Sequence, residues 1–193
     1  MPRTKQFDEK EVLNKAMELF WEKGFHATSM QDLVSHLGIN RASLYDTFGG
    51  KDALFESAFA LYRKTSSGML EQLFDSAASI KEGFQKLFEQ AIEESIHDEC
   101  RKGCFVVNTT TELVPGNDKI LEVIHENNTN AENLFTGFVQ KGINTGELQS
   151  NKKANEIGLM LFALFSGIRV LAKVEPNREK LQKIVNSGLS VLD

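Results

Sequence analysis

The sequence of 193 residues has little of what marks several common classes of protein. Its 2 cysteines are too few for the disulfide framework of a small secreted domain, and its 3 prolines and 14 glycines are too few for a collagen-like chain. Hydrophobic residues still make up 41% of the chain and include 14 phenylalanines. The chain can therefore bury a sizeable core, and we do not expect it to be disordered.

Positive charge is also scarce, because 22 Lys and Arg residues face 27 Asp and Glu residues, which gives a net charge of −5. An acidic chain is by its overall charge a poor partner for nucleic acid. Total charge does not exclude such a partner, however, because DNA binding depends on where the positive side chains stand.

Long hydrophobic runs are absent as well. The longest apolar run without a charge, residues 157–168, is too short to span a bilayer and suits a buried helix. The N-terminus lacks the apolar stretch of a secretory signal. We therefore expect a cytoplasmic protein with no membrane partner.

Apolar residues recur at helical spacing in nearly every segment, and no segment shows the alternation of a strand. Asp8, Thr28 and Asn40 are expected to cap three short helices within the first fifty residues, with Gly24 and Gly38 ending the first two. Longer helices are expected near residues 52–74, 80–91, 103–113, 120–143, 153–174 and 177–192, with the one near 120–143 interrupted by the poor helix formers at 127–130. The sequence thus predicts an all-α fold of about nine helices, with a three-helix domain over 6–60 and a larger helical domain over 61–193.

The segment from residue 30 to residue 45 has the pattern of a helix-turn-helix. Gly38 stands in the turn, where the backbone needs a positive φ. Apolar residues on both sides hold the two helices together: Leu33, Leu37, Ile39 and Leu44.

The second helix of this pattern presents Arg41, Ala42 and Ser43 at its N-terminal end, where a recognition helix reaches base edges. Arginine bonds guanine at two atoms, serine bonds either type of base, and an alanine methyl touches the methyl of thymine. In the alternative interpretation Arg41 is a solvated charge, and Tyr45 and Phe48 are core aromatics of a three-helix bundle.

Residues from about 12 to 58 resemble the N-terminal domain of the tetracycline-repressor (TetR/AcrR) family of transcriptional regulators. The resemblance rests on these residues and their joint spacing: Ala16, Leu19, Phe20, Gly24, Phe25, Thr28, Ser29, Gly38, Ile39, Asn40, Ser43, Leu44, Tyr45, Phe48 and Lys51 to Leu54.

The resemblance implies a repressor whose helix-turn-helix, about 29–48, binds a palindromic double-stranded DNA operator as a homodimer. Arg41, Ala42 and Ser43 would read bases, and Tyr45 would contact the backbone or a base. Phosphates would be held by Thr28, Asn40, Thr47 and Lys51, with Asn40 offering the N-terminus of its helix. Three departures are Val34 in place of a small alanine, Thr47 in place of a frequent histidine, and the Gly49-Gly50 pair in place of basic or polar residues.

The resemblance also implies that residues 61–193 bind a small effector, apolar or aromatic in character, that releases the repressor from DNA. Aromatic residues of this part would line the cavity, with two polar residues as handles. The candidates are Phe84, Phe88, Phe105, Asn108, Thr109, Phe135, Phe138, Phe162 and Phe165. In the alternative interpretation these phenylalanines form an ordinary core.

The helix expected over 154–172 is apolar around much of its circumference, so it must be buried. Small residues along it would let the same helix of a second subunit approach, and the last helix would complete an intersubunit four-helix bundle. The expected interface residues are Gly158, Phe162, Ala163, Ser166, Gly167, Leu181, Ile184, Val185 and Leu189. Burial within the same chain is the alternative.

No pattern in the sequence indicates an enzyme. Cys100 and Cys104 have neither the spacing of a redox pair nor the partners of a metal site, and we expect a buried Cys104 and an incidental Cys100 rather than a redox switch. We see no Gly-rich phosphate loop, no nucleophile motif and no cofactor site. Two other hypotheses stay open: a DNA-binding or adaptor protein without effector control, and a helical carrier or enzyme that has lost DNA binding.

Overall fold

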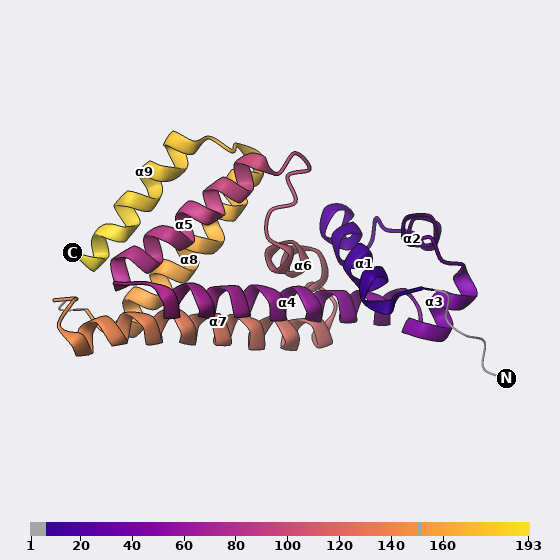
Figure 1. Ribbon diagram of the computed structural model, residues 1–193, viewed down its shortest axis with the longest axis horizontal. Helices are drawn as coiled ribbons and strands as arrows, with labels where there is room; N and C mark the ends of the chain where they lie inside the picture. The colour runs from indigo at the N-terminus through magenta and orange to yellow at the C-terminus, as the bar shows by residue number, and fades with distance from the viewer. Residues whose placement is uncertain (1–6, 150–151) are drawn as a thin grey trace. The chain divides into compact units, whose positions relative to one another are not determined.

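The computed structural model describes residues 7–149 and 152–193. All regular elements of these residues are helical (Figure 1). They are α1 (Glu9–Lys23), α2 (Met30–Leu37), α3 (Arg41–Phe48), α4 (Lys51–Ser76), α5 (Ile80–His97), α6 (Phe105–Leu113), α7 (Asp118–Thr145), α8 (Ala154–Val174), α9 (Arg178–Leu189) and the 3-10 turn η1 (Ser190–Leu192). The prediction of an all-α fold with about nine helices is confirmed.

The chain divides into two compact units, Met1–Thr65 and Ser66–Asp193. Helix α4 begins in the first unit and ends in the second, so one continuous helix carries the chain from one to the other. The division expected from the sequence, between residues 60 and 61, falls within this same helix.

The helix ends of the first unit are fixed by short-range hydrogen bonds. The Asp8 carboxylate accepts from the backbone N–H of Lys10 at 2.8 Å and caps α1. The Asn40 side chain accepts from the N–H of Ser43 at 2.9 Å and caps α3. Gly38 ends α2 with a φ of +68°, a conformation that costs glycine little. These caps and this stop agree with the sequence prediction.

The cap of α2 differs from the prediction by one residue. Ser29, not Thr28, is the N-cap: its hydroxyl accepts from the N–H of Asp32 at 3.0 Å, and the Asp32 carboxylate accepts from the N–H of Ser29 at 2.9 Å. Thr28 is fully buried and donates its hydroxyl hydrogen bond to the carbonyl of Gly24 at 2.6 Å. Both residues suit a cap, and the reciprocal bonding of Ser29 and Asp32 decides between them.

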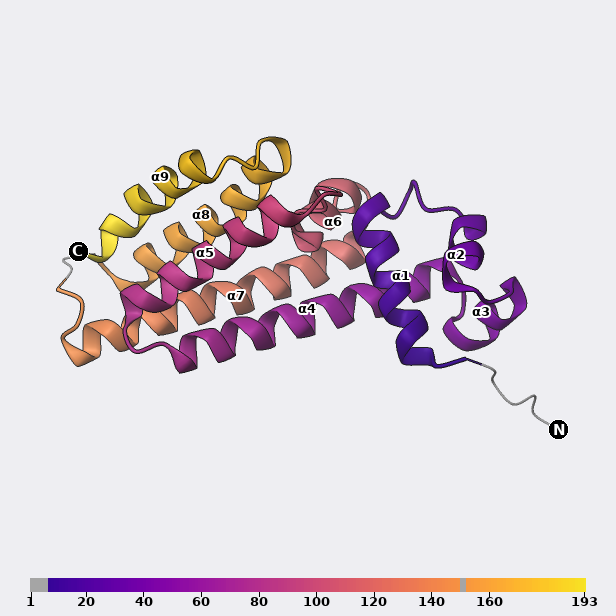
Figure 2. The same cartoon turned by 45° about the horizontal axis from the view of Figure 1, so that its top comes forward.

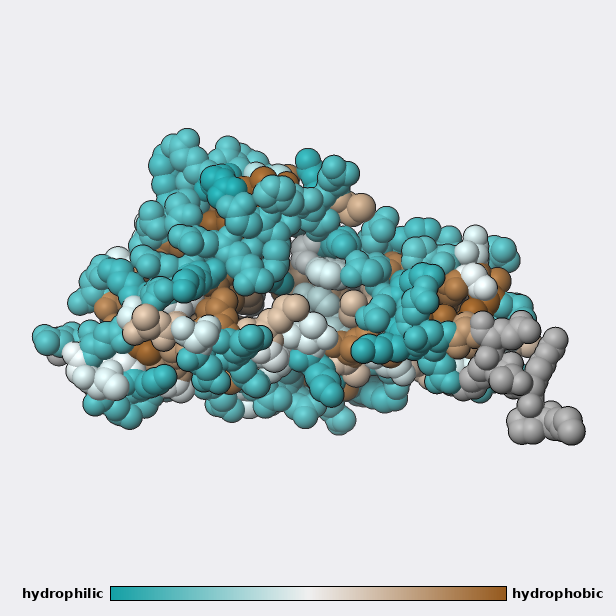
Figure 3. Space-filling view, in the orientation of Figure 1, coloured by the Kyte–Doolittle hydropathy of each residue, from teal (hydrophilic) through white to brown (hydrophobic). Residues whose placement is uncertain are grey.

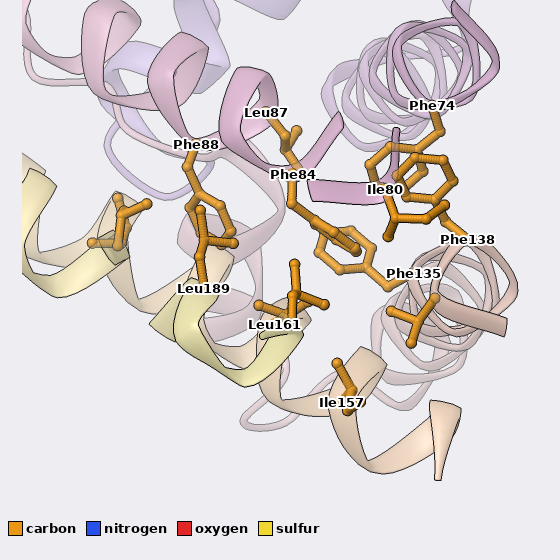
Figure 4. Close-up of a cluster of buried hydrophobic side chains, with 14 of the residues drawn as sticks. Phe74, Ile80, Phe84, Leu87, Phe88, Phe135, Phe138, Ile157, Leu161 and Leu189 are labelled. Atoms are coloured by element: carbon orange, nitrogen blue, oxygen red, sulfur yellow. The ribbon is translucent and has the colours of Figure 1, made fainter. Parts of the chain in front are cut away.

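Phenylalanine rings meet one another in the core of the second unit (Figure 4). Phe74 of α4 stacks on Phe138 of α7 with ring centroids 4.1 Å apart, and Phe84 of α5 lies 5.5 Å from Phe135 of α7. Phe84 and Phe135 have no exposed surface, and Phe138 is 7% exposed. Residues 51 and 64 positions apart in sequence therefore meet ring against ring.

Helix α7 runs without interruption through the poor helix formers from Asn127 to Asn130. Its buried residues, among them Ile124 and Phe135, lie on one face on both sides of that stretch. It also packs closely on α8, since a side chain at Gly158 would meet the backbone of Thr136 at 2.8 Å. Packing along the whole helix therefore outweighs the local propensity that suggested a break.

Helices α5, α8 and α9 lie side by side in the second unit (Figure 2). By length and composition alone, the 21-residue helix α8 is apolar enough to cross a membrane, although the longest uncharged run suggested otherwise. Its inner face packs in the core through Ile157, Leu161 and Ile168, as in a core helix. On the face in Figure 3, hydrophilic residues cover most of the surface and hydrophobic residues form smaller patches.

Candidate nucleic-acid interface

The predicted helix-turn-helix is formed by α2, a turn at Gly38 and α3. Leu33 and Leu44 have no exposed surface, and Ile39 is 8% exposed, so the apolar residues hold the two helices together as expected. Because Leu44 faces inward, the residues on the opposite side of α3 face solvent.

The solvent-facing side of α3 carries most of the expected DNA-contacting residues. Arg41, Ala42 and Tyr45 are exposed, and Ser43 and Thr47 are half-buried. Asn40 is exposed, and its side-chain oxygen already caps α3. The structure thus brings the three predicted base readers to one exposed helix end, which agrees with a recognition helix.

Thr28 does not share this surface. Its side chain is buried and its hydroxyl is bonded to the Gly24 carbonyl, so it is not available to a phosphate oxygen. The physical reason is the one-residue shift of the α2 cap: Ser29, which is exposed, occupies the position at the helix N-terminus. This corrects the expected phosphate contact of the Thr28 side chain.

Lys51, an expected phosphate ligand in the first turn of α4, lies against an aromatic ring. Its ammonium is 4.3 Å from the ring centroid of Phe25, and that ring packs edge-on against Phe55 at 5.0 Å. Helical spacing does not reveal this pairing, because Phe25 belongs to the connection between α1 and α2. Only the presence of an aromatic residue after Gly24 hints at it.

The charge around the helix-turn-helix is nearly balanced. Residues 1–50 contain 6 Lys and Arg against 7 Asp and Glu, a net charge of −1. The hydrogen bond from the Ser29 hydroxyl, with Lys23 at 3.0 Å, holds the pKa of the Asp32 carboxyl well below its usual range. Asp32 is therefore ionised at neutral pH and partly offset by Lys23.

Two family models match the chain. Residues 12–58 match the model of the bacterial regulatory proteins of the tetR family. Residues 80–187, more than half of the chain, match the model of the tetracycline repressor-like C-terminal domain. The chain belongs to the TetR family. The predicted resemblance is thereby confirmed, and it extends to the second unit, which carried no diagnostic residues in the sequence.

Individual relatives of this TetR-family protein cover nearly its whole length. The uncharacterized HTH-type transcriptional regulator YezE of Bacillus subtilis is 33% identical over 100% of both chains. The HTH-type transcriptional repressor ComR of Escherichia coli is 28% identical over 97% of this chain and 90% of its own. A solved structure of a cysteine mutant of the regulator CifR, complexed with 26-bp operator DNA, is 27% identical, with a TM-score of 0.88 over 99% of this chain and 100% of that one.

The aromatic residues expected to line an effector cavity divide into two groups. Phe84, Phe135 and Phe138 pack ring against ring in the core, and Phe162 joins them with its ring 5.7 Å from that of Phe135. Phe88 is fully buried and lies 6.0 Å from Phe165. These residues fill the core of the second unit, as in the alternative interpretation.

The second group lies on α6. Phe105 and Thr109 are buried on one face of this helix, and the Thr109 hydroxyl has no hydrogen-bond partner among the described residues. Asn108 donates to the Lys102 carbonyl at 2.7 Å and accepts from Lys173 at 3.0 Å, so both ends of its amide are engaged.

An open pocket of about 450 Å³ lies elsewhere, where the end of α7 meets the start of α8. The expected effector residues do not line it. Its lining residues are Thr136, Gln140, Ile143, Lys152, Lys153, Ala154 and Asn155.

The residues expected at a dimer interface also fall into two groups, one packed within the subunit and one on an exposed surface of α8. Leu181, Val185 and Leu189 of α9 are at most 3% exposed because they pack in the core of their own unit. Gly158 is covered by Thr136 of α7. Ile184 and Phe162 are half-buried against the same core. Leu181, Val185, Leu189 and Gly158 are therefore covered within the subunit, because α5 and α7 occupy the faces that a partner was expected to use, whereas Phe162 and Ile184 keep part of their surface exposed.

Helix α8 nevertheless leaves an apolar surface open. Ala163 is exposed, Ser166 and Gly167 are half-buried, and a side chain added at Gly167 would meet nothing within 4 Å. Further apolar residues share this side within about a third of the helix circumference. We call the surface the α8 stripe, made of Leu159, Met160, Ala163, Gly167, Val170, Leu171 and Val174.

Cys100 and Cys104 lie on the connection between α5 and α6. Cys100 is exposed and Cys104 is half-buried at the start of α6. Within the described part of the chain, no group of three or more His, Cys, Asp or Glu side chains is placed to hold a metal ion.

Proposed function

We propose that this TetR-family protein is a cytoplasmic repressor that binds a palindromic operator as a homodimer and is released by a small apolar or aromatic effector. The observation that carries the proposal is the exposed end of α3, where Arg41, Ala42 and Ser43 follow the capping residue Asn40. These side chains offer a guanine-binding fork, a methyl group and a hydroxyl to base edges. The operator complex of CifR and the repressor ComR support the same function.

Dimerisation is supported by the α8 stripe. Val174 is 76% exposed and Val170 47%, and apolar surface of this kind along a whole helix is costly in water. A two-fold axis would bring the stripe against itself and bury both copies. Small residues at its middle, Ala163 and Gly167, would allow the two helices to approach closely. A dimer would place two recognition helices about 34–36 Å apart, as successive major grooves require.

Effector binding is supported by the unpartnered hydroxyl of Thr109 on α6. Leaving a buried hydroxyl without a hydrogen bond costs about 1–3 kcal/mol, and a ligand with a polar group would recover part of it. Phe105, one turn earlier on the same buried face, would supply apolar contact. We therefore place the effector beside α6 rather than among Phe84, Phe135 and Phe138.

A second candidate function is a DNA-binding protein without effector control. The close-packed phenylalanine core favours it, since Phe74 and Phe138 already lie 4.1 Å apart and leave no room between them. A thermal-shift screen with small aromatic compounds separates the two functions. Repression under effector control requires at least one compound that raises the melting temperature and weakens operator binding. The second function requires that none does.

Binding-site selection from a random DNA library, followed by affinity measurements with two variants, tests the DNA-binding part. Arg41→Ala should lower operator affinity by about 1–3 kcal/mol and relax the preference at one position of each half-site. Lys51→Ala should weaken binding to all sequences alike and reduce the dependence on salt. A wild-type protein that selects no palindromic site would contradict the proposal.

Light scattering with charged variants tests the dimer. Ala163→Glu combined with Val170→Glu should convert a dimer into a monomer, because two carboxylates would be buried at the α8 stripe in each subunit. Leu121→Glu is the matched control, since Leu121 is an exposed leucine of α7, 46% exposed, outside the stripe. A wild-type monomer, or wild-type protein that sediments with membranes, would refute this assignment of the stripe.

A further inference from the structure

We propose that Tyr45 is a positioning residue for Arg41. We propose further that Gly50, which has no side chain, gives the Tyr45 ring the space in which it lies. Through this arrangement the Arg41 guanidinium is held for reading a guanine base. The inference rests on the proposed operator binding and adds the residues that set its base specificity.

The two side chains meet on the exposed side of α3. The guanidinium carbon of Arg41 lies 5.7 Å from the ring centroid of Tyr45, one helical turn further on. Both residues are exposed, with Tyr45 at 45%, so neither is fixed by burial in the core. A long arginine side chain in water loses much rotamer freedom when it binds a base. Contact with the aromatic ring limits that freedom before DNA arrives.

The Tyr45 ring is held in turn by the backbone at the start of α4. A side chain at Gly50 would lie 3.0 Å from Cε1 of this ring and 3.5 Å from Cδ1. Gly50 is buried, and its carbonyl accepts from the N–H of Leu54 at 3.0 Å, which fixes the backbone there. A side chain at Gly50 would therefore push the ring away by a few tenths of an ångström. The Gly49-Gly50 pair, which lacks the positive charge usual at this place, thus has a structural role.

The arrangement of Arg41 and Tyr45 predicts which base the arginine reads. A guanidinium held in one orientation suits the N7 and O6 acceptors of guanine, which it bonds as a fork. A tyrosine hydroxyl that only touches a phosphate would raise affinity for every sequence equally. The two roles of Tyr45 therefore differ in whether its loss changes base preference or only overall affinity.

The experiment uses the full chain and an operator obtained by binding-site selection. Affinities are measured for duplexes in which each half-site guanine is replaced by adenine or by 7-deazaguanine, which lacks N7. Arg41→Ala identifies the position that Arg41 reads, as a loss of preference of about five- to 150-fold. Tyr45→Leu should reduce the preference at that same position about two- to fivefold, the range of an exposed cation–π contact. Tyr45→Phe, which keeps the ring, should retain it.

A glycine pair provides the matched control. Gly50→Ala should displace the ring and reduce the same preference. Gly49→Ala likewise places a side chain at a positive φ, +83° against +121° at Gly50, but this side chain would meet only Ala53 at an ordinary 3.5 Å and should leave the preference intact. This pair also decides the question if Tyr45→Leu fails to fold, as judged by circular dichroism.

The outcomes distinguish the inference from the function beneath it. A uniform loss of affinity for all duplexes in Tyr45→Leu, or equal effects of the two glycine variants, overturns the positioning role. If Arg41→Ala changes no base preference, the positioning role also fails while operator binding stands. If the wild-type chain selects no operator, the proposed function itself fails.

Discussion

The helix ends of the first unit and the core of the second unit depend on contacts of different range in the sequence. In the first, helix ends are fixed by residues two to four positions apart, such as Ser29 with Asp32 and Asn40 with Ser43. In the second, the core joins residues more than fifty positions apart, such as Phe84 with Phe135. The recognition helix thus depends on local bonds that can be read along the chain, and the second unit depends on packing that cannot.

The largest expected effect breaks the long-range core. Phe135→Ala should lower the free energy of unfolding of the second unit by about 3–5 kcal/mol, because the ring is fully buried and its removal leaves a cavity between Phe84 and Phe162. Urea unfolding followed by circular dichroism measures it. Leu121→Ala on the same helix should change little, since Leu121 is exposed. A loss below about 1 kcal/mol in Phe135→Ala would mean that the ring is not packed as described.

A smaller effect of opposite sign is expected on α6. Thr109→Val removes a buried hydroxyl without a partner and keeps the shape, so the protein should gain up to about 1 kcal/mol, or a few degrees in melting temperature. Thr111→Val is the control, because its exposed hydroxyl donates to the Asn108 carbonyl at 3.0 Å. If melting temperature falls in Thr109→Val, this hydroxyl has a partner in solution and the effector site beside α6 loses its support.

The smallest expected effect concerns the short-range hydrogen bonds at the helix ends of the first unit. The folded protein lowers the pKa of Asp32, so its carboxylate stabilises the fold above the pKa of an unfolded aspartate, and this contribution is lost as pH falls. Asp32→Asn should therefore be less stable than wild type at pH 7, and the difference should shrink by pH 3. Urea midpoints from the fluorescence of Trp21, the single tryptophan, measure this. Asp52→Asn is the control, and a difference that grows in acid would contradict the assignment.

The sequence predicted the first unit nearly residue by residue. Capping at Asp8 and Asn40, the stop at Gly38 and the exposed end of α3 all agree with the structure. The error at Thr28 arose because two adjacent residues could serve as the cap, and only the bond from the Asp32 N–H to the Ser29 hydroxyl separates them. The ring of Phe25 beneath Lys51 could not be predicted, since the pair is brought together where the connection after α1 packs against α4 through Phe25 and Phe55.

In the second unit the sequence located the helices but not their partners. The break expected near Asn127 is absent, because α7 has buried residues on one face on both sides of it. Leu181 and Val185 were apolar at helical spacing, which shows that they must be buried and does not show by which chain. The structure buries them within their own subunit and leaves Val170 and Val174 exposed.

By itself the sequence determined the helical fold, the helix-turn-helix and the family, because caps, glycine stops and apolar spacing act over a few residues. The tertiary structure alone decided which apolar faces are covered, that the buried Thr109 hydroxyl has no hydrogen-bond partner among the described residues, and that Gly50 lies against the ring beside Arg41. The physical reason is range: a hydrogen bond at a helix end needs only neighbours in sequence. Burial of a surface depends on which segment, distant in the sequence, packs against it in the folded chain.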